Sequence, residues 1–115
     1  MDIEEVRLFA LGLHERVTED LFVENWLTFR AEGKWFLLMQ LDAPQPRVAV
    51  KLPPERNAQL RAELAGVRPA FHMNKVHWSD LYLDELPRET VVSLVRESFQ
   101  LVVSRLPKAF RSQYG

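Results

Sequence analysis

Cysteine is absent from this chain of 115 residues. Its absence excludes disulfides, thiolate zinc sites, iron–sulfur clusters and cysteine nucleophiles. The N-terminus, Met1 to Glu5, is acidic and lacks the basic start and the apolar segment of a signal peptide. The longest apolar run, Trp35 to Met39, is far shorter than the ~20 residues that a membrane-spanning helix needs. These absences predict a cytoplasmic protein that does not cross a membrane.

Catalytic motifs are also missing. The four glycines are not clustered, so there is no glycine-rich phosphate loop. No serine lies in a Gly-x-Ser-x-Gly elbow, which excludes that form of nucleophile. His77 and Asp80 could act as a base and its orienting carboxylate, but such a pair often occurs by chance. We therefore expect no enzymatic activity and no cofactor.

A metal site has little support in the spacing of the histidines. His72 and His77 are five residues apart, and Asp80 is the nearest acid that could join them. A catalytic zinc site requires three ligands that converge on one point. Because the spacing fixes no third ligand, we expect no bound metal.

The net charge of −1 is small, but the charges are unevenly distributed. Residues 1–50 carry five basic and nine acidic side chains, whereas residues 51–115 carry ten basic and seven acidic ones. The last fifteen residues contain Arg105, Lys108 and Arg111 and no acid. Such a distribution can orient a charged partner, although it is equally compatible with an ordinary solvated surface.

Hydrophobic periodicity predicts the secondary structure. Helical patterns cover residues 2–13, 54–64 and 87–106, and the first begins with a capping box formed by Asp2 and Glu5. A polar stretch through Asp20 reads as a loop. Alternating or continuous apolar runs predict strands at 26–31, 34–42, 47–52 and 77–83, with a shorter extended segment at 67–71. Glu32-Gly33 indicates a tight turn between the first two strands.

This order of elements is α-β-β-β-α-β(-β)-α. It predicts a single α+β domain over residues 1–115, with an antiparallel sheet of four to five strands and helices packed mainly on one face. The composition, 47% hydrophobic and 27% charged, is typical of a globular domain. Residues 107–115 follow a proline and are expected to form a loose tail.

The segment Phe71 to Trp78 concentrates two histidines, an asparagine, a lysine and a tryptophan in eight residues. Together with Gly66 to Ala70 it closely resembles the signature of the MmcQ/YjbR-like family of small bacterial proteins. The junction Val50-Lys51-Leu52-Pro53-Pro54 and the segment Glu97 to Lys108 resemble further parts of that family. The likeness covers nearly the whole chain. One departure is Val76, where the family often has a second basic residue.

The resemblance implies a fold like that of the bacterial frataxin CyaY. It also implies DNA binding, which is predicted for the family by its similarity to the double-wing domain of the transcription factor MotA. On this basis we expect a weak nucleic-acid interface made of the region from Arg68 to Trp78 and the basic last helix. Arg68 and Lys75 would contact phosphates, His72, His77 and Asn74 would supply hydrogen bonds, and Trp78 would stack on a base or anchor the loop.

Two alternatives remain open. The sequence pI of about 6.3 is low for a nucleic-acid-binding module. The same residues could be structural, with Asn74 capping a turn and Trp78 packed in the interior. The chain could also be a protein–protein interaction module without a nucleic-acid role, using Trp26, Trp35 and Phe36 as an exposed aromatic patch.

Overall fold

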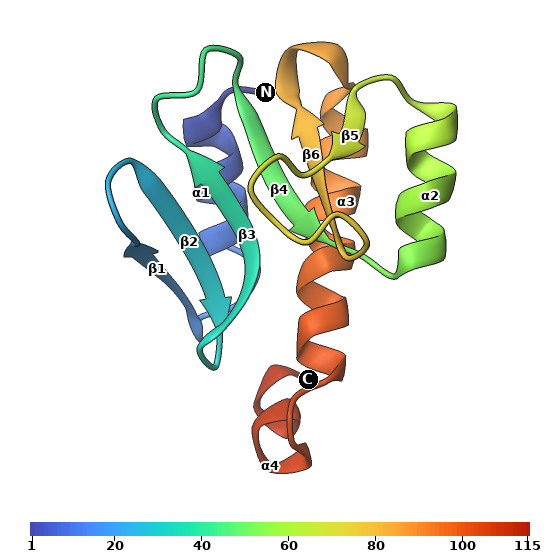
Figure 1. Ribbon diagram of the computed structural model, residues 1–115. Helices are drawn as coiled ribbons and strands as arrows, with labels where there is room; N and C mark the ends of the chain where they lie inside the picture. Colours follow the sequence, from blue (N-terminus) through green and yellow to red (C-terminus); the bar gives the residue numbers. More distant parts are fainter.

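The computed structural model describes residues 1–115. It contains one six-stranded sheet in the order β1-β2-β3-β4-β6-β5, in which every neighbouring pair is antiparallel (Figure 1). The strands are β1 (Val17–Leu21), β2 (Trp26–Ala31), β3 (Lys34–Gln40), β4 (Arg47–Lys51), β5 (Val67–Pro69) and β6 (Trp78–Tyr82). The helices are α1 (Ile3–Leu11), α2 (Pro54–Glu63), α3 (Arg88–Ser104) and α4 (Lys108–Arg111), with 3-10 turns at Leu83–Glu85 and Ser112–Tyr114.

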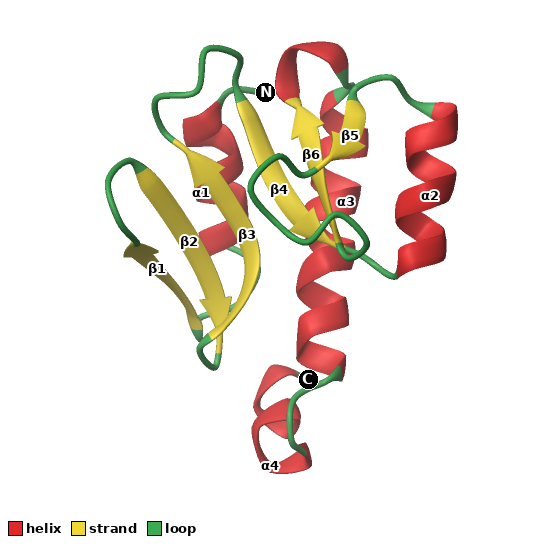
Figure 2. Cartoon of the chain, in the orientation of Figure 1, coloured by secondary structure: helices red, strands yellow, loops and turns green.

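Helices α1 and α3 lie on one face of the sheet, and α2 lies beside the β5 edge (Figure 2). The opposite face carries no helix and is crossed only by the loop between β5 and β6, residues 70–77. The predicted α+β class and the one-sided placement of the helices are therefore confirmed. None of the helices has both the length and the apolar composition needed to span a bilayer.

The predicted number of strands was too low. The polar stretch through Asp20 was expected to form a loop, but Val17–Leu21 form edge strand β1, which pairs with β2 from Val17–Ala31 to Leu21–Leu27. Only Val17 is buried in this strand, so the apolar alternation that reveals a half-buried strand is absent. Polar side chains are common on edge strands because they discourage pairing with another molecule.

The first helix begins as its sequence predicts. The Asp2 carboxylate accepts a hydrogen bond from the Glu5 backbone N–H at 2.8 Å, and the Glu5 carboxylate accepts one from the Asp2 N–H at 3.1 Å. These two bonds satisfy donors that have no partner within the helix. The helix then buries Val6 and Ala10 against the core.

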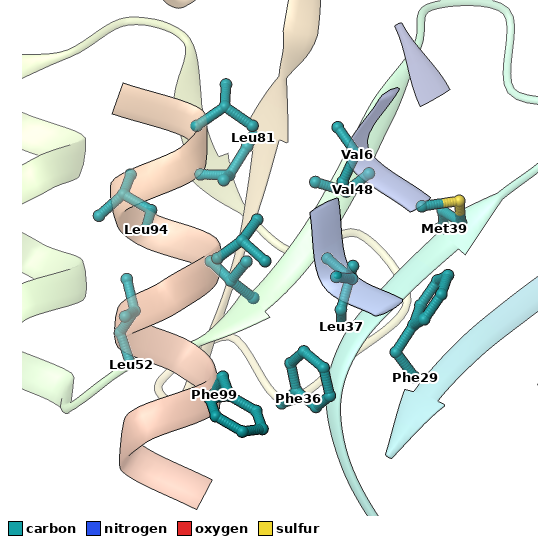
Figure 3. Packing of buried hydrophobic residues seen from close by; sticks show 14 of the residues in the cluster. Val6, Phe29, Phe36, Leu37, Met39, Val48, Leu52, Leu81, Leu94 and Phe99 are labelled. Atoms are coloured by element: carbon teal, nitrogen blue, oxygen red, sulfur yellow. The ribbon is translucent and has the colours of Figure 1, made fainter. Parts of the chain in front are cut away.

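The main core lies between the sheet and helices α1 and α3. Figure 3 shows Phe36 from β3 beside Phe99 of α3, and Val48 from β4 beside Val6 of α1. Phe36 and Phe99 meet edge to face with ring centroids 5.2 Å apart. Burial of this apolar surface is the principal stabilising term of the fold.

A bulge in β3 explains why two consecutive residues face this core. Phe29 pairs with Leu37 and Arg30 pairs with Trp35, so Phe36 is an extra residue without a partner in β2. Phe36 and Leu37 consequently both point toward the helices and are fully buried. Trp35 is displaced to the opposite face. This arrangement accounts for the continuous apolar run in β3.

The bulge also interrupts the ladder between β3 and β4, which extends only from Leu37–Val50 to Met39–Val48. The buried hydroxyl of Ser98 on α3 fills the interruption. It accepts a hydrogen bond from the Lys51 N–H at 2.9 Å and donates one to the Phe36 carbonyl at 2.6 Å. One side chain thus satisfies backbone groups of both strands and ties α3 to the sheet.

The expected loose tail is instead helical. After Pro107, helix α4 and the 3-10 turn at Ser112–Tyr114 fold back on the molecule. The Tyr114 ring lies 4.7 Å from the ring of His14 and 5.9 Å from that of Phe99. Its hydroxyl donates a hydrogen bond to the Glu32 carboxylate at 3.2 Å. The aromatic residue near the end of the chain supplies the contacts that order the tail.

The Ser98→Ala variant should lose about 1–3 kcal/mol of unfolding free energy, because the buried Lys51 N–H and Phe36 carbonyl lose their partner. Urea unfolding followed by circular dichroism would measure the loss. Ser93→Ala, an exposed substitution on the same helix, should change the unfolding free energy by less than about 0.5 kcal/mol. Equal stability of the two variants would contradict the bridging role of Ser98.

Candidate functional site

The face of the sheet that carries no helix holds all three tryptophans. Trp78 belongs to a small apolar cluster with Leu38, Ala49 and Ala70, and Trp26 and Trp35 pack against it. We call this group, together with Met73, the outer cluster. Phe36, which could have shared an exposed aromatic patch with Trp26 and Trp35 in the protein-interaction alternative, is fully buried in the main core.

The loop of residues 70–77 covers part of this face, and its turn is formed by Asn74. The Asn74 side-chain oxygen accepts hydrogen bonds from the Val76 N–H at 2.9 Å and the His77 N–H at 3.3 Å. The Asn74 carbonyl accepts another from the Trp78 N–H at 2.9 Å. Asn74 therefore has the turn-forming contacts that the structural alternative anticipated.

Arg68 lies on β5 at the edge of the sheet, where its guanidinium is already engaged. It donates two hydrogen bonds to the Glu85 carboxylate, at 2.6 and 2.8 Å, and one to the Ala65 carbonyl at 3.1 Å. It also stacks over the Tyr82 ring, 4.0 Å from the centroid. These contacts satisfy Arg68 within the protein, so a phosphate would have to compete with Glu85 for it.

The remaining predicted residues occupy different environments. Lys75 is exposed and its ammonium makes no hydrogen bond or ion pair. His72 is also exposed, with its ring edge to face against Trp26 at 5.6 Å. His77 is half-buried, and its carbonyl accepts a hydrogen bond from the Leu52 N–H at 3.0 Å. Trp78 is only 7% exposed and anchors the loop from below.

Two residues of α2 hold the loop in place and were not singled out from the sequence. Arg61 donates hydrogen bonds at 2.6 Å to the carbonyls of Lys75 and Trp78. Asn57, one helical turn earlier, is buried and donates at 3.0 Å to the Val76 carbonyl. Both side chains also bond the Ser79 hydroxyl. The sequence signal that could have identified them is the i, i+4 spacing of Asn57 and Arg61 in a helix with few apolar residues.

Asp80 holds the start of the loop from β6. Its side chain is 8% exposed, accepts a hydrogen bond from the Phe71 N–H at 3.1 Å, and lies 3.7 Å from the Arg47 guanidinium. Burial raises the pKa of the Asp80 carboxyl above 3.8, although the Phe71 hydrogen bond and the positive charge of Arg47 oppose that shift. Loss of solvent outweighs Arg47 because no direct hydrogen bond joins the two side chains.

A basic groove of about 630 Å³ lies where β3 and β4 separate beyond the bulge. Its cationic side chains come from β2, the start of β3, the end of β4 and the residue after α3: Arg30, Lys34, Lys51 and Arg105. Its aromatic walls are Phe22, Trp35 and Trp78. No acidic residue lines this groove.

The cations of the groove are largely free of partners within the protein. Lys34, Lys51 and Arg105 form no ion pair. Arg30 donates a long hydrogen bond to the Thr28 hydroxyl at 3.5 Å and lies over the Trp35 ring, 5.7 Å from its centroid. Its contact with a carboxylate is distant, 3.9 Å to the exposed Asp20. Four nearby positive charges with only this one distant carboxylate favour an anionic ligand. Lys51 is the lysine of the Lys-Leu-Pro-Pro junction, so that motif was the sequence signal for this groove.

A smaller aromatic pocket of about 210 Å³ adjoins the groove. It is lined by side chains of the β1–β2 loop, β2, β3 and the loop of residues 70–77, chiefly Phe22, Trp26, Trp35, Leu38, His72 and Met73. Val23 and Asn25 adopt positive φ angles of 49° and 65°, so the β1–β2 loop turns tightly. The Phe22 ring is consequently placed edge to face against Trp35 at 5.2 Å.

No group of three His, Asp or Glu side chains lies close enough together to hold a metal ion.

The raised pKa of Asp80 predicts a pH-dependent stability. A group whose pKa is higher in the folded state contributes stability below its unfolded pKa, near 3.8, and loses it as the pH rises through the folded value. The wild-type protein should therefore lose unfolding free energy relative to Asp80→Asn between about pH 4 and neutrality. Urea unfolding of both proteins across this range would measure it. The opposite trend would mean that Arg47 outweighs burial.

Comparison with known proteins places the chain in one family. The family model described as YjbR matches residues 11–101. The chain is 37% identical over 83 residues to YjbR of Escherichia coli K12, which is described as an uncharacterised protein. The match covers 71% of this chain and 70% of YjbR. Similarity to YbdF of Escherichia coli O157:H7 is 31% over 81 residues, covering 70% of this chain and 66% of YbdF.

Solved structures share the fold along almost the whole chain. The crystal structure of protein DR2400 of Deinococcus radiodurans, a DUF419 domain, matches with a TM-score of 0.87 and 28% identity, covering 99% of this chain and 88% of that protein. A protein from Pseudomonas syringae matches with a TM-score of 0.76 and 26% identity, covering 89% of this chain and 99% of its own. The extent of the family match, the identity to YjbR and the shared fold together establish that this chain belongs to the YjbR family.

Proposed function

We propose that this protein is a non-enzymatic, cytoplasmic binding protein that holds single-stranded nucleic acid in the basic groove, where the sheet meets the end of α3. The observation that carries the proposal is the basic groove, where Arg30, Lys34, Lys51 and Arg105 surround a space lined by aromatic rings and by no acid. Phosphates require cations, and unpaired bases require flat apolar surfaces. The groove offers both within one site.

The groove changes the location of the interface predicted from the sequence. The basic last helix contributes through Arg105, and the region from Arg68 to Trp78 contributes through Trp78. Arg68 is a weak candidate because Glu85 already binds it with two hydrogen bonds. Lys75 and His72 are exposed on the neighbouring loop, where they would extend the contact surface beyond the groove.

The charge of the whole molecule limits the strength of such binding. A net charge of −1 gives no general attraction for a polyanion, so the affinity depends on the few cations of the groove. We therefore expect modest affinity that falls steeply as salt is added. An apolar interface with another protein would show little salt dependence.

A protein partner is the second candidate, and a specific feature favours it. The end of β1, the β1–β2 loop and the loop of residues 70–77 expose Leu21, Phe22, Val23, Phe71 and Val76. Exposed apolar residues that gather on one side of a molecule are typical of interfaces. This reading leaves the unpaired cations of the groove unexplained, which is why we rank it second.

Labelled single-stranded and double-stranded DNA and RNA should reveal the interface in fluorescence anisotropy at about 50 and 200 mM salt. We expect single strands to bind more tightly than duplexes and to weaken as salt rises. Lys51→Ala should reduce affinity about tenfold at the lower salt, the effect expected for one charge-assisted contact, and should do so for all sequences alike.

Two comparisons locate the site. Arg105→Ala should weaken binding, whereas Arg96→Ala should not, because both arginines are exposed on or beside α3 but only Arg105 lines the groove. The Lys75→Ala variant distinguishes binding in the basic groove from binding at the loop of residues 70–77. If Lys75→Ala abolishes binding and Lys51→Ala has no effect, the loop is the interface and the groove is not. Absence of binding by the folded protein at the lower salt would refute the nucleic-acid function.

A further inference from the structure

The aromatic pocket and the basic groove share two walls. Phe22 and Trp35 line both spaces, so a ligand held in the groove lies directly beside the pocket. The pocket differs in chemistry from the groove because it has no charged lining and is formed mainly by aromatic and apolar side chains. Two adjoining spaces of different chemistry suit a ligand with an anionic part and a flat apolar part.

The rings of the pocket form two edge-to-face pairs. Phe22 meets Trp35 at 5.2 Å with planes 66° apart, and Trp26 meets His72 at 5.6 Å with planes 88° apart. The first pair joins the β1–β2 loop to β3, and the second joins β2 to the loop of residues 70–77. The pocket is therefore lined by residues of both loops and of the strands between them.

Its volume of about 210 Å³ is below the roughly 300 Å³ at which pockets for drug-sized ligands begin. It can hold one ring system and not a whole ligand. The adjoining groove, of about 630 Å³, has room for the rest. The pocket therefore has the size of a single base, and the groove has room for the sugar–phosphate backbone that carries the base.

We propose that the aromatic pocket receives one unpaired base of a single-stranded nucleic acid whose phosphates lie in the basic groove. This inference rests on the proposed function and makes it specific. Bases stack on aromatic side chains regardless of sequence, because every base has a flat π face. A base inside a duplex is already paired and stacked and would have to leave the helix before it could enter.

His72 gives the pocket a hydrogen-bonding group. Its ring makes aromatic contacts with Trp26 and Phe71, but neither ring nitrogen has a hydrogen-bond partner in the protein. A neutral imidazole carries one donor and one acceptor, which match the mixed donor and acceptor pattern of a base edge. The hydroxyl of Thr28 is less available because it bonds the Asp20 carbonyl at 3.2 Å.

The test uses two oligonucleotides of about six residues, the shorter part of the range that small nucleic-acid-binding domains cover. One is oligothymidylate, and the other has the same phosphates but no bases. Anisotropy at low salt should give roughly tenfold tighter binding of oligothymidylate, the order of magnitude of one stacked base. Phe22→Ala should remove most of that preference without abolishing binding to either oligonucleotide.

Phe110→Ala is the matched control, since Phe110 is 46% exposed and Phe22 is 45% exposed. Phe110 lies on α4 and lines neither the pocket nor the groove. It should keep the preference for oligothymidylate. His72→Ala should reduce the preference in the same direction as Phe22→Ala, and because His72 is exposed the variant should remain folded.

Three outcomes are distinguishable. A preference for oligothymidylate that Phe22→Ala removes and Phe110→Ala retains supports the base pocket. Equal binding of the two oligonucleotides, weakened by Lys51→Ala, overturns the base pocket while the groove still binds phosphates. Binding of neither oligonucleotide overturns the proposed function, and the base pocket falls with it.

Discussion

The arrangement of side chains on both faces of the sheet depends on the two hydrogen bonds of the Ser98 hydroxyl. The bulge at Phe36 leaves a carbonyl and an N–H without ladder partners, and Ser98 supplies one group that serves both. Without such a group, the buried backbone of two central strands would carry unmatched polar atoms, which is costly in the interior. The bulge can therefore persist, and the strands can diverge beside α3. The main core gains Phe36 in addition to Leu37 and Met39 of β3, and the other face gains Trp35.

The open face combines rigid and adjustable parts. Trp26 and Trp35 project from strands whose register is fixed by the turn at Glu32-Gly33, with φ angles of 49° and 78°. Trp78 projects from β6, which is paired on both sides, with β4 and β5. The two loops that rim the pocket have few apolar contacts with the main core, and α2 holds one of them through Asn57 and Arg61. An aromatic floor beneath loops fastened by polar contacts is typical of binding sites that a rigid scaffold positions.

Much of the fold could be predicted from the sequence, because periodic apolar residues report burial. Helices α1, α2 and α3, the central strands, the capping box and the turn at Glu32-Gly33 follow from local patterns. Strand β1 could not be predicted in this way, since a polar edge strand buries only Val17. The ordered tail depends on contacts of Tyr114 with residues far away in the chain.

The site was harder to predict because it, too, depends on contacts between residues that are far apart in the chain. The segment from His72 to Trp78 was conspicuous by composition, but Asn74 and Trp78 have mainly structural contacts. The groove combines Arg30 and Lys34 from the acidic half of the sequence with Lys51 and Arg105 from the basic half, so the charge of any one segment does not reveal it.

The Glu32 carboxylate also joins distant segments, because it binds both Arg16 and Tyr114, and Tyr114 is 82 residues away in the chain. Closing so long a loop costs entropy, and neither α4 nor the 3-10 turn contains a buried residue. We infer that the tail joins the structure after the sheet has assembled and can detach while the sheet remains intact.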